Sequence, residues 1–133
     1  MPQLLPAQVA QFLKRFRFTG GRLRRFRIMN RSARHSTGEI VISVREGEAK
    51  VRLRLVFDAV EEYRFQRRPG PGLVRLKEVK IGSFDGLIYF NLDAYPDDAP
   101  PGIHDFRASD AFIGARILNW EIVPRRPKPP EKS

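Results

Sequence analysis

Arginine is the residue type with the clearest chemical meaning in the first third of this chain. Residues 1–34 contain nine Lys or Arg side chains and no Asp or Glu. A guanidinium group binds carboxylates and phosphates through two parallel hydrogen bonds, so clustered arginines predict an anionic partner. Six of them flank one alternating apolar segment and form the candidate partner-binding site: Arg22, Arg24, Arg25, Arg27, Arg31 and Arg34.

The charge distribution along the chain supports the same prediction. The formal net charge is +10, but residues 35–121 contain twelve Lys or Arg against fourteen Asp or Glu. Residues 122–133 contain four basic side chains and one acidic side chain. Charge concentrated at the two ends indicates an acidic or polyanionic partner more strongly than the same charge spread evenly.

Three interpretations of the basic segment stay open. The first is binding to an acidic protein surface, which includes a second copy of the chain. The second is weak, salt-sensitive binding of nucleic acid, in which Phe16, Phe18 and Phe26 supply rings among the arginines for stacking on bases. In the third, Arg25 and Arg27 belong to a solvated sheet face opposite acidic groups of the same chain.

Catalytic and metal-binding chemistry has little support. The pairs His35-Ser36 and His104-Asp105 could supply a base, but no Gly-x-Ser-x-Gly context surrounds a nucleophile. The aspartates of residues 93–110 lack the alternating ligands and central glycine of a calcium loop. Zinc normally requires more His or Cys than two histidines provide. We therefore predict no enzyme activity, no catalytic residue, no cofactor and no metal site.

The hydrophobic pattern predicts one helix followed by strands. Val9, Phe12, Leu13 and Phe16 follow helical spacing, and residues 19–21 then break the chain. From there the apolar period changes to two. Strands are predicted over residues 23–29, 40–44, 49–57, 60–66, 73–81, 87–93 and 115–123.

The segments on either side of residues 46–48 form the clearest hairpin. In its second strand Leu53 and Leu55 are predicted to be core residues, while Arg52 and Arg54 face solvent. Strict alternation of this kind favours antiparallel pairing with one wet face. The fold class is thus mainly β: an antiparallel sandwich or partly open barrel of about seven strands with one short N-terminal helix.

Length and composition predict one domain over residues 1–123, followed by a flexible tail rich in Pro, Lys and Arg over residues 124–133. The chain contains no cysteine, which fits a reducing cytoplasm. Neither a signal peptide nor an apolar stretch of about 20 residues is present, so we expect a cytoplasmic protein without a membrane partner.

One segment resembles a known group of proteins. Residues 51–65 form a strand of alternating charged and apolar residues that ends in Phe-x-x-Val (Phe57 to Val60) and is followed by another strand. This stretch is similar to the middle of small bacterial domains found among uncharacterised proteins and some immunity proteins of toxin systems. By element order the resemblance spans roughly residues 22–123, and it implies a β-rich domain without transferring any site residue. We expect a non-enzymatic binding protein.

Overall fold

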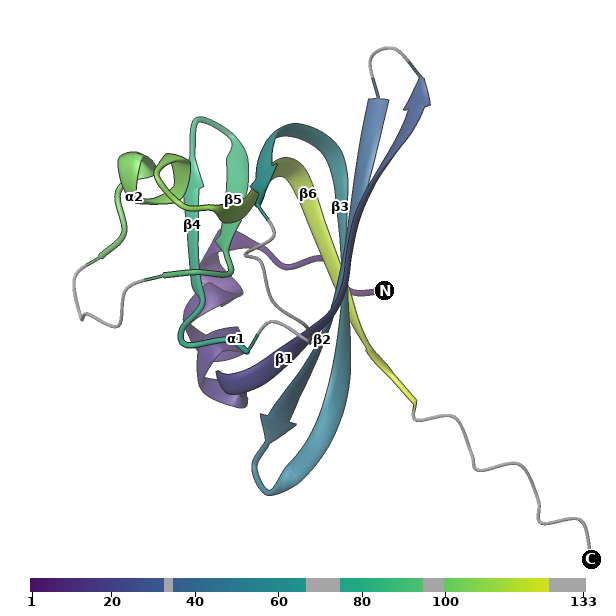
Figure 1. Ribbon diagram of the computed structural model, residues 1–133, viewed down its shortest axis with the longest axis vertical. Coiled ribbons are helices and arrows are strands. Elements are labelled where there is room, and N and C mark those ends of the chain that lie inside the picture. Colours follow the sequence, from purple (N-terminus) through teal and green to yellow (C-terminus); the bar gives the residue numbers. More distant parts are fainter. Residues whose placement is uncertain (33–34, 67–74, 95–99, 125–133) are drawn as a thin grey trace, which may run out of the picture.

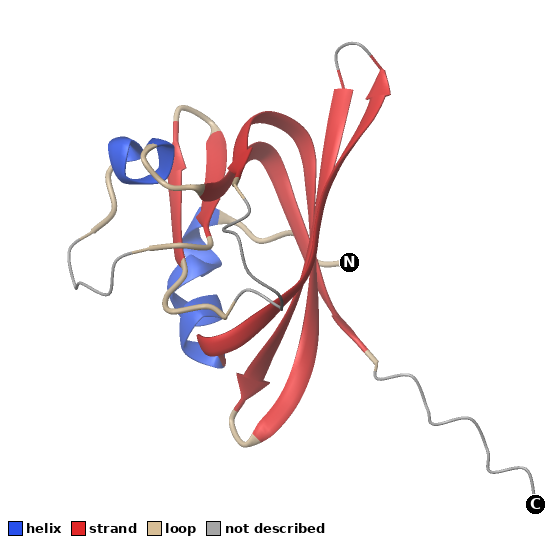
Figure 2. Ribbon diagram, in the orientation of Figure 1, coloured by secondary structure: helices blue, strands red, loops and turns tan. Residues whose placement is uncertain are grey.

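The computed structural model describes residues 1–32, 35–66, 75–94 and 100–124, and within them the protein is mainly β, as predicted (Figures 1 and 2). A short 3-10 helix, η1 (Pro6–Gln8), leads into α1 (Val9–Arg15). The strands are β1 (Phe16–Ser32), β2 (His35–Glu46), β3 (Ala49–Phe65), β4 (Lys80–Phe84), β5 (Leu87–Asn91) and β6 (Ala111–Val123). A second helix, α2 (Ile103–Arg107), precedes β6.

These strands form one six-stranded antiparallel sheet in the order β1-β2-β3-β6-β5-β4. The sheet is open but strongly curled, and Figure 1 shows β4 and β5 facing the long strands β1, β2 and β3. The segment just before β4 reaches β1 through a bridge between Arg22 and Arg75. The backbone amide of Gly20 donates to Leu76 O and the amide of Leu76 donates to Gly21 O, both at 2.8 Å. The two edges of the sheet thus approach each other, as in a partly open barrel.

The main core lies inside this curl. Leu53, Leu55 and Phe57 of β3 are fully buried and Arg52 is exposed, as predicted. Arg54, which is also predicted to face solvent, lies on the outer side of β3 but is half-buried. Helix α1 covers the core because its apolar stripe points inward. The ring of Phe12 packs edge-on against Trp120 at a centroid distance of 5.4 Å. The face of β1, β2 and β3 that points away from this core is called the outer face below.

Two of the predicted strand breaks are wrong. The glycines of residues 19–21 do not interrupt the chain, because β1 begins at Phe16 and runs through them. The strands predicted over residues 49–57 and 60–66 are one strand, β3, which bends at Ala59 with a φ of 53° and keeps its pairing with β6. A bulge lets a strand bend without losing its partner, and this explains why six strands replace about seven.

Sequence patterns missed a small second core around α2. Tyr89, Phe106 and Phe112 pack there with Leu87. Residues 76–79 of the predicted strand 73–81 lie outside any strand, and regular pairing begins at Lys80. The predicted turn at residues 67–72, Arg34 and residues 125–133 of the predicted tail fall outside the described residues. No helix in the described ranges has the length and apolar character needed to cross a membrane.

Candidate anion-binding site

The site begins with a kink in β1. Between the pairs Arg17–Arg45 and Arg22–Ser43, β1 contains four residues and β2 contains one. Gly20 adopts a φ of +80°, which favours glycine. A Cβ atom on Gly21 would lie 2.6 Å from the backbone oxygen of Ser43. The two glycines therefore allow β1 to bend out of the sheet and return to it. The bent segment forms one side of a concave surface beside β2.

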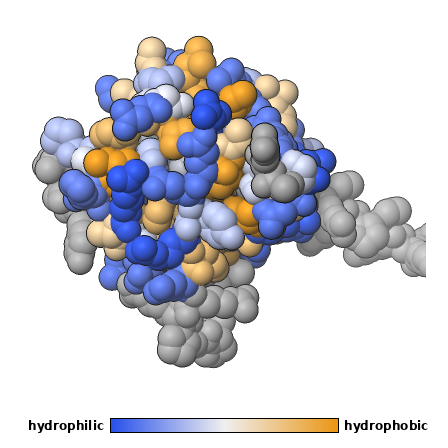
Figure 3. Space-filling model, turned by 90° about the horizontal axis from the view of Figure 1, so that it is seen from above, coloured by the Kyte–Doolittle hydropathy of each residue, from blue (hydrophilic) through white to orange (hydrophobic). Residues whose placement is uncertain are grey.

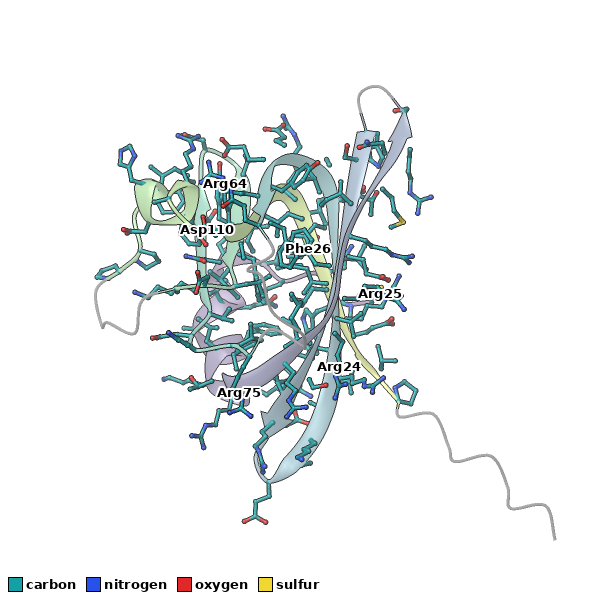
Figure 4. All side chains as sticks on the ribbon, viewed as in Figure 1. Arg24, Arg25, Phe26, Arg64, Arg75 and Asp110 are labelled. Atoms are coloured by element: carbon teal, nitrogen blue, oxygen red, sulfur yellow. The ribbon has the colours of Figure 1, made fainter. Side chains whose placement is uncertain are left out.

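A concave space of about 350 Å³ lies against this kink, and we call it the kink pocket. Its lining residues are Arg17, Thr19, Gly20, Gly21, Arg22, Arg24, Ser43, Val44, Arg45, Lys50 and Arg75. Among the described residues, five arginines and one lysine contribute to it, and no acidic residue does. Figure 4 shows two of these side chains, Arg24 and Arg75, near the lower end of the molecule.

Cations in the kink pocket face one another across the strands. Arg45 lies directly opposite Arg17 on one side and Lys50 on the other, and Arg22 is opposite Arg75. Like charges in directly opposed positions destabilise a sheet. None of these five side chains forms an ion pair with an acid in the part of the chain that the structure describes. The pocket thus holds positive charge without internal compensation.

A second group of arginines on the outer face is compensated. We define the Glu39 cluster as Glu39, Arg25, Arg27, Arg54 and Glu121. The carboxylate of Glu39 is 2% exposed and lies 3.2 Å from Arg25 Nη1, 2.8 Å from Arg27 Nε and 2.6 Å from Arg54 Nε. Arg54 also reaches Glu121, at 3.2 Å. These contacts confirm the interpretation in which Arg25 and Arg27 face an acid of the same chain.

The arginines keep Glu39 ionised. Burial by itself raises the pKa of Glu39, but hydrogen bonds from Arg54 and Arg25 and the charge of Arg27 outweigh that effect. Its pKa therefore lies below the ordinary value of 4.5. In return, the hydrogen bond to Glu39 raises the pKa of Arg54. The cluster consequently stays charged at neutral pH.

The structure separates the predicted site residues into different places. Arg22 and Arg24 line the kink pocket, whereas Arg25 and Arg27 belong to the Glu39 cluster. Arg31 is exposed near the end of β1 and lines neither region. Arg34 cannot be placed, because it lies outside the described residues.

Sequence reasoning missed four cations of the kink pocket: Arg17, Arg45, Lys50 and Arg75. Two of them could have been found, because the predicted hairpin around residues 46–48 brings Arg45 opposite Lys50. No sequence pattern predicts the position of Arg75, because it lies opposite Arg22 of β1 only as a result of the curling of the sheet.

Within the described part of the chain, no aromatic ring lines the kink pocket. Phe16 and Phe18 are 1% and 5% exposed and belong to the core. Phe26 is half-buried and stacks on Phe65, with centroids 4.5 Å apart. Figure 4 shows Phe26 and Arg25 on opposite sides of the sheet. None of these three rings is therefore placed to stack on a base bound among the basic side chains.

The residues considered above for catalysis or metal binding do not come together in a site within the described ranges. Ser36 Oγ donates to Asn30 Oδ1 at 2.7 Å, while His35 Nε2 lies 2.8 Å from Asp58, so this histidine does not contact this serine. His104 is exposed on α2. In residues 1–32, 35–66, 75–94 and 100–124, no three His, Asp or Glu side chains gather closely enough to hold a metal ion.

The half-buried carboxylate of Glu62 connects α2 to the sheet. The hydroxyl of Tyr89 donates to Glu62, and Arg107 Nε of α2 lies 3.1 Å from the same carboxylate. The hydrogen bond from Tyr89 lowers the pKa of Glu62, and burial raises the pKa of Tyr89. Arg64, beside Asp110 in Figure 4, donates to the carbonyl of Arg107 at 3.0 Å. These contacts hold α2 against β3 and β5.

On the surface seen from above in Figure 3, the described residues form no large hydrophobic patch that would indicate a second binding site. Apolar and hydrophilic residues alternate over that surface (Figure 3). Exposed large apolar side chains such as Tyr63 and Ile117 occur among the described residues, but isolated ones are normal on a protein surface.

Comparison with protein-family models, with curated proteins and with solved structures found no significant match to this chain. The likeness to bacterial immunity-type domains therefore stays a prediction.

Proposed function

We propose that the protein is a non-enzymatic binding protein whose kink pocket receives the carboxylates of an acidic partner protein. One observation carries the proposal: Arg45 lies between two directly opposed cations, Arg17 and Lys50. This arrangement costs free energy in the unbound protein. An anion bound between the three side chains would offset that cost, because each cation would gain an opposite charge and a charge-assisted hydrogen bond.

Several of the protein's own acids are already paired. Glu46 pairs with Arg15, Glu61 with Arg116 and Glu62 with Arg107, while Glu39 is enclosed by its cluster. Glu48 and Asp85 are exposed and form no ion pair within the described ranges, so a second copy of the chain is an alternative source of carboxylates to a different acidic protein. The absence of cysteine fits a cytoplasmic setting for this partner.

Nucleic acid is the alternative partner. The charge of the pocket would attract phosphates, but Phe16, Phe18 and Phe26 are taken up by packing and offer no stacking surface. Stacking on aromatic rings normally adds about 1–3 kcal/mol per base to single-strand binding. Without it, affinity for a single strand should come from charge alone and fall steeply as salt is added.

The test is a binding titration of labelled hexaglutamate, compared with an oligonucleotide of equal formal charge. Lys50→Glu changes a pocket residue, and Lys14→Glu is the matched control, because Lys14 is exposed on α1 and lines no part of the pocket. We expect Lys50→Glu to weaken hexaglutamate binding about tenfold and Lys14→Glu to change it less than about twofold.

Equal losses in the two variants, or no binding of hexaglutamate at low salt, would contradict the proposal. Tighter binding of the oligonucleotide than of hexaglutamate, lost in Lys50→Glu only, would favour nucleic acid as the partner.

A further inference from the structure

A second concave space lies on the outer face next to the kink pocket. Its volume is about 430 Å³, and we call it the Glu39 cavity. Its lining residues are Arg24, Arg25, Glu39, Val41, Arg52, Arg54 and Val123. Arg24 lines both spaces, so they adjoin each other.

The two spaces follow the same strand. Ile40, Ile42 and Val44 of β2 are buried in the core, so the alternating residues Glu39 and Arg45 point to the outer face. Arg45 lines the kink pocket and Glu39 lines the other cavity. Six residue steps separate Glu39 from Arg45, which corresponds to about 20 Å of strand. The basic surface is therefore long enough for an extended segment of about six residues.

The Glu39 cavity keeps positive charge and hydrogen-bond donors for a ligand. Four arginines line it against one glutamate. Arg52 is exposed and pairs with no acid in the described ranges. Arg25 is 55% exposed and uses one terminal nitrogen on Glu39. Because a guanidinium group carries five N–H donors, this contact orients Arg25 without exhausting it.

We infer that the Glu39 cavity is a second anion subsite, and that the two subsites together bind an extended acidic segment of about six residues. This inference rests on the proposed function. Side chains of an extended peptide point to the same side at every second residue, which is also the period of the outer-face residues of β2. Carboxylates at alternate positions of the ligand would thus meet Lys50 and Arg45 at one end, then Arg52 two residues further along β3, and finally Arg25 opposite Val41.

The experiment compares a long and a short ligand with three variants. Hexaglutamate with blocked ends can span both subsites, whereas blocked diglutamate fills one and should prefer the kink pocket, which contains no acid. Arg25→Gln changes the end of the Glu39 cavity that lies opposite Val41, Lys50→Gln changes the kink pocket, and Arg31→Gln is the control on β1. Binding is followed by NMR titration, and circular dichroism verifies that each variant is folded.

We expect Arg25→Gln to weaken hexaglutamate binding about fivefold and to leave diglutamate binding unchanged. Lys50→Gln should weaken both ligands, and Arg31→Gln neither. If hexaglutamate binds and depends on Lys50, but Arg25→Gln behaves like the Arg31→Gln control, the second subsite is wrong while the proposed function stands. If Arg25→Gln weakens diglutamate as much as hexaglutamate, the two-subsite arrangement is also wrong. If hexaglutamate does not bind the unaltered protein, the proposed function fails as well.

Discussion

The Glu39 cluster and the kink pocket lie on the same face of the same three strands, and both consist mainly of arginine. In the cluster, one buried carboxylate contacts three guanidinium groups. In the pocket, six cations surround a space without any acid among its lining residues. The residue that β2 places opposite β1 makes this difference: Arg27 faces Glu39, whereas Arg17 faces Arg45. Identical side chains on one strand therefore stabilise the fold in one place and remain available to a ligand in the other.

Among the substitutions that test this difference, Glu39→Gln should change the free energy of unfolding most. Removing the charge leaves three guanidinium groups without their shared partner, and the hydrogen bonds lost are charge-assisted. We expect the free energy of unfolding to fall by about 2–3 kcal/mol. Lys50→Gln in the kink pocket should change it by less than about 0.5 kcal/mol. Urea denaturation measures both, and similar losses would show that the two regions do not differ as described.

Acid should remove the same stabilisation reversibly. The pKa of Glu39 is lower in the folded protein than its ordinary value of 4.5, so the ionised carboxylate contributes stability above that value. This contribution is lost as the pH falls through the folded pKa. The difference in stability between the unaltered protein and Glu39→Gln should thus be largest near neutral pH and shrink below about pH 4.5. A difference that is constant from neutral to acidic pH would mean that Glu39 acts through packing rather than charge.

Gly21→Ala tests whether the kink shapes the pocket. The new Cβ atom would lie 2.6 Å from Ser43 O and 2.8 Å from Phe18 O, both backbone atoms that cannot move aside independently. We expect a loss of about 1–3 kcal/mol in stability, as for other overpacked sites, together with weaker hexaglutamate binding. Gly102→Ala is the control, because its nearest neighbour would be 3.6 Å away. Thermal unfolding measures the loss of stability, and the hexaglutamate titration measures the loss of binding. If Gly21→Ala is destabilised but binds hexaglutamate as tightly as the unaltered protein, the kink does not shape the binding site.

The smallest expected effect has the opposite sign. Arg45→Thr removes a cation that lies opposite two others and introduces a residue suited to strands. We expect it to stabilise the protein by about 0.2–1 kcal/mol and to weaken binding of an acidic peptide. Such a trade of stability for binding is typical of functional sites. Chemical denaturation will detect it, and a destabilised Arg45→Thr would show that Arg45 supports the fold.

Much of the local structure follows from the sequence. The period of two in β3 determines that Leu53 and Leu55 are buried while Arg52 is exposed, because a slip by one residue would bury guanidinium groups. Helical spacing likewise determines that Phe12 faces the core from α1. Charge composition alone indicates an anionic partner.

Only the tertiary structure decided which arginines act together. Periodicity assigns a side chain to a face of its strand, but the neighbour across the sheet depends on pairing and register, which are non-local. The kink at Gly20 and Gly21 and a second shift between Leu23 and Arg25 set that register, so Arg22 lies in the pocket while Arg27 meets Glu39. Arg75 joins β1 only because the sheet curls until its two edges approach. Contacts of this kind depend on the bending of the whole sheet, for which no short segment of sequence carries the information.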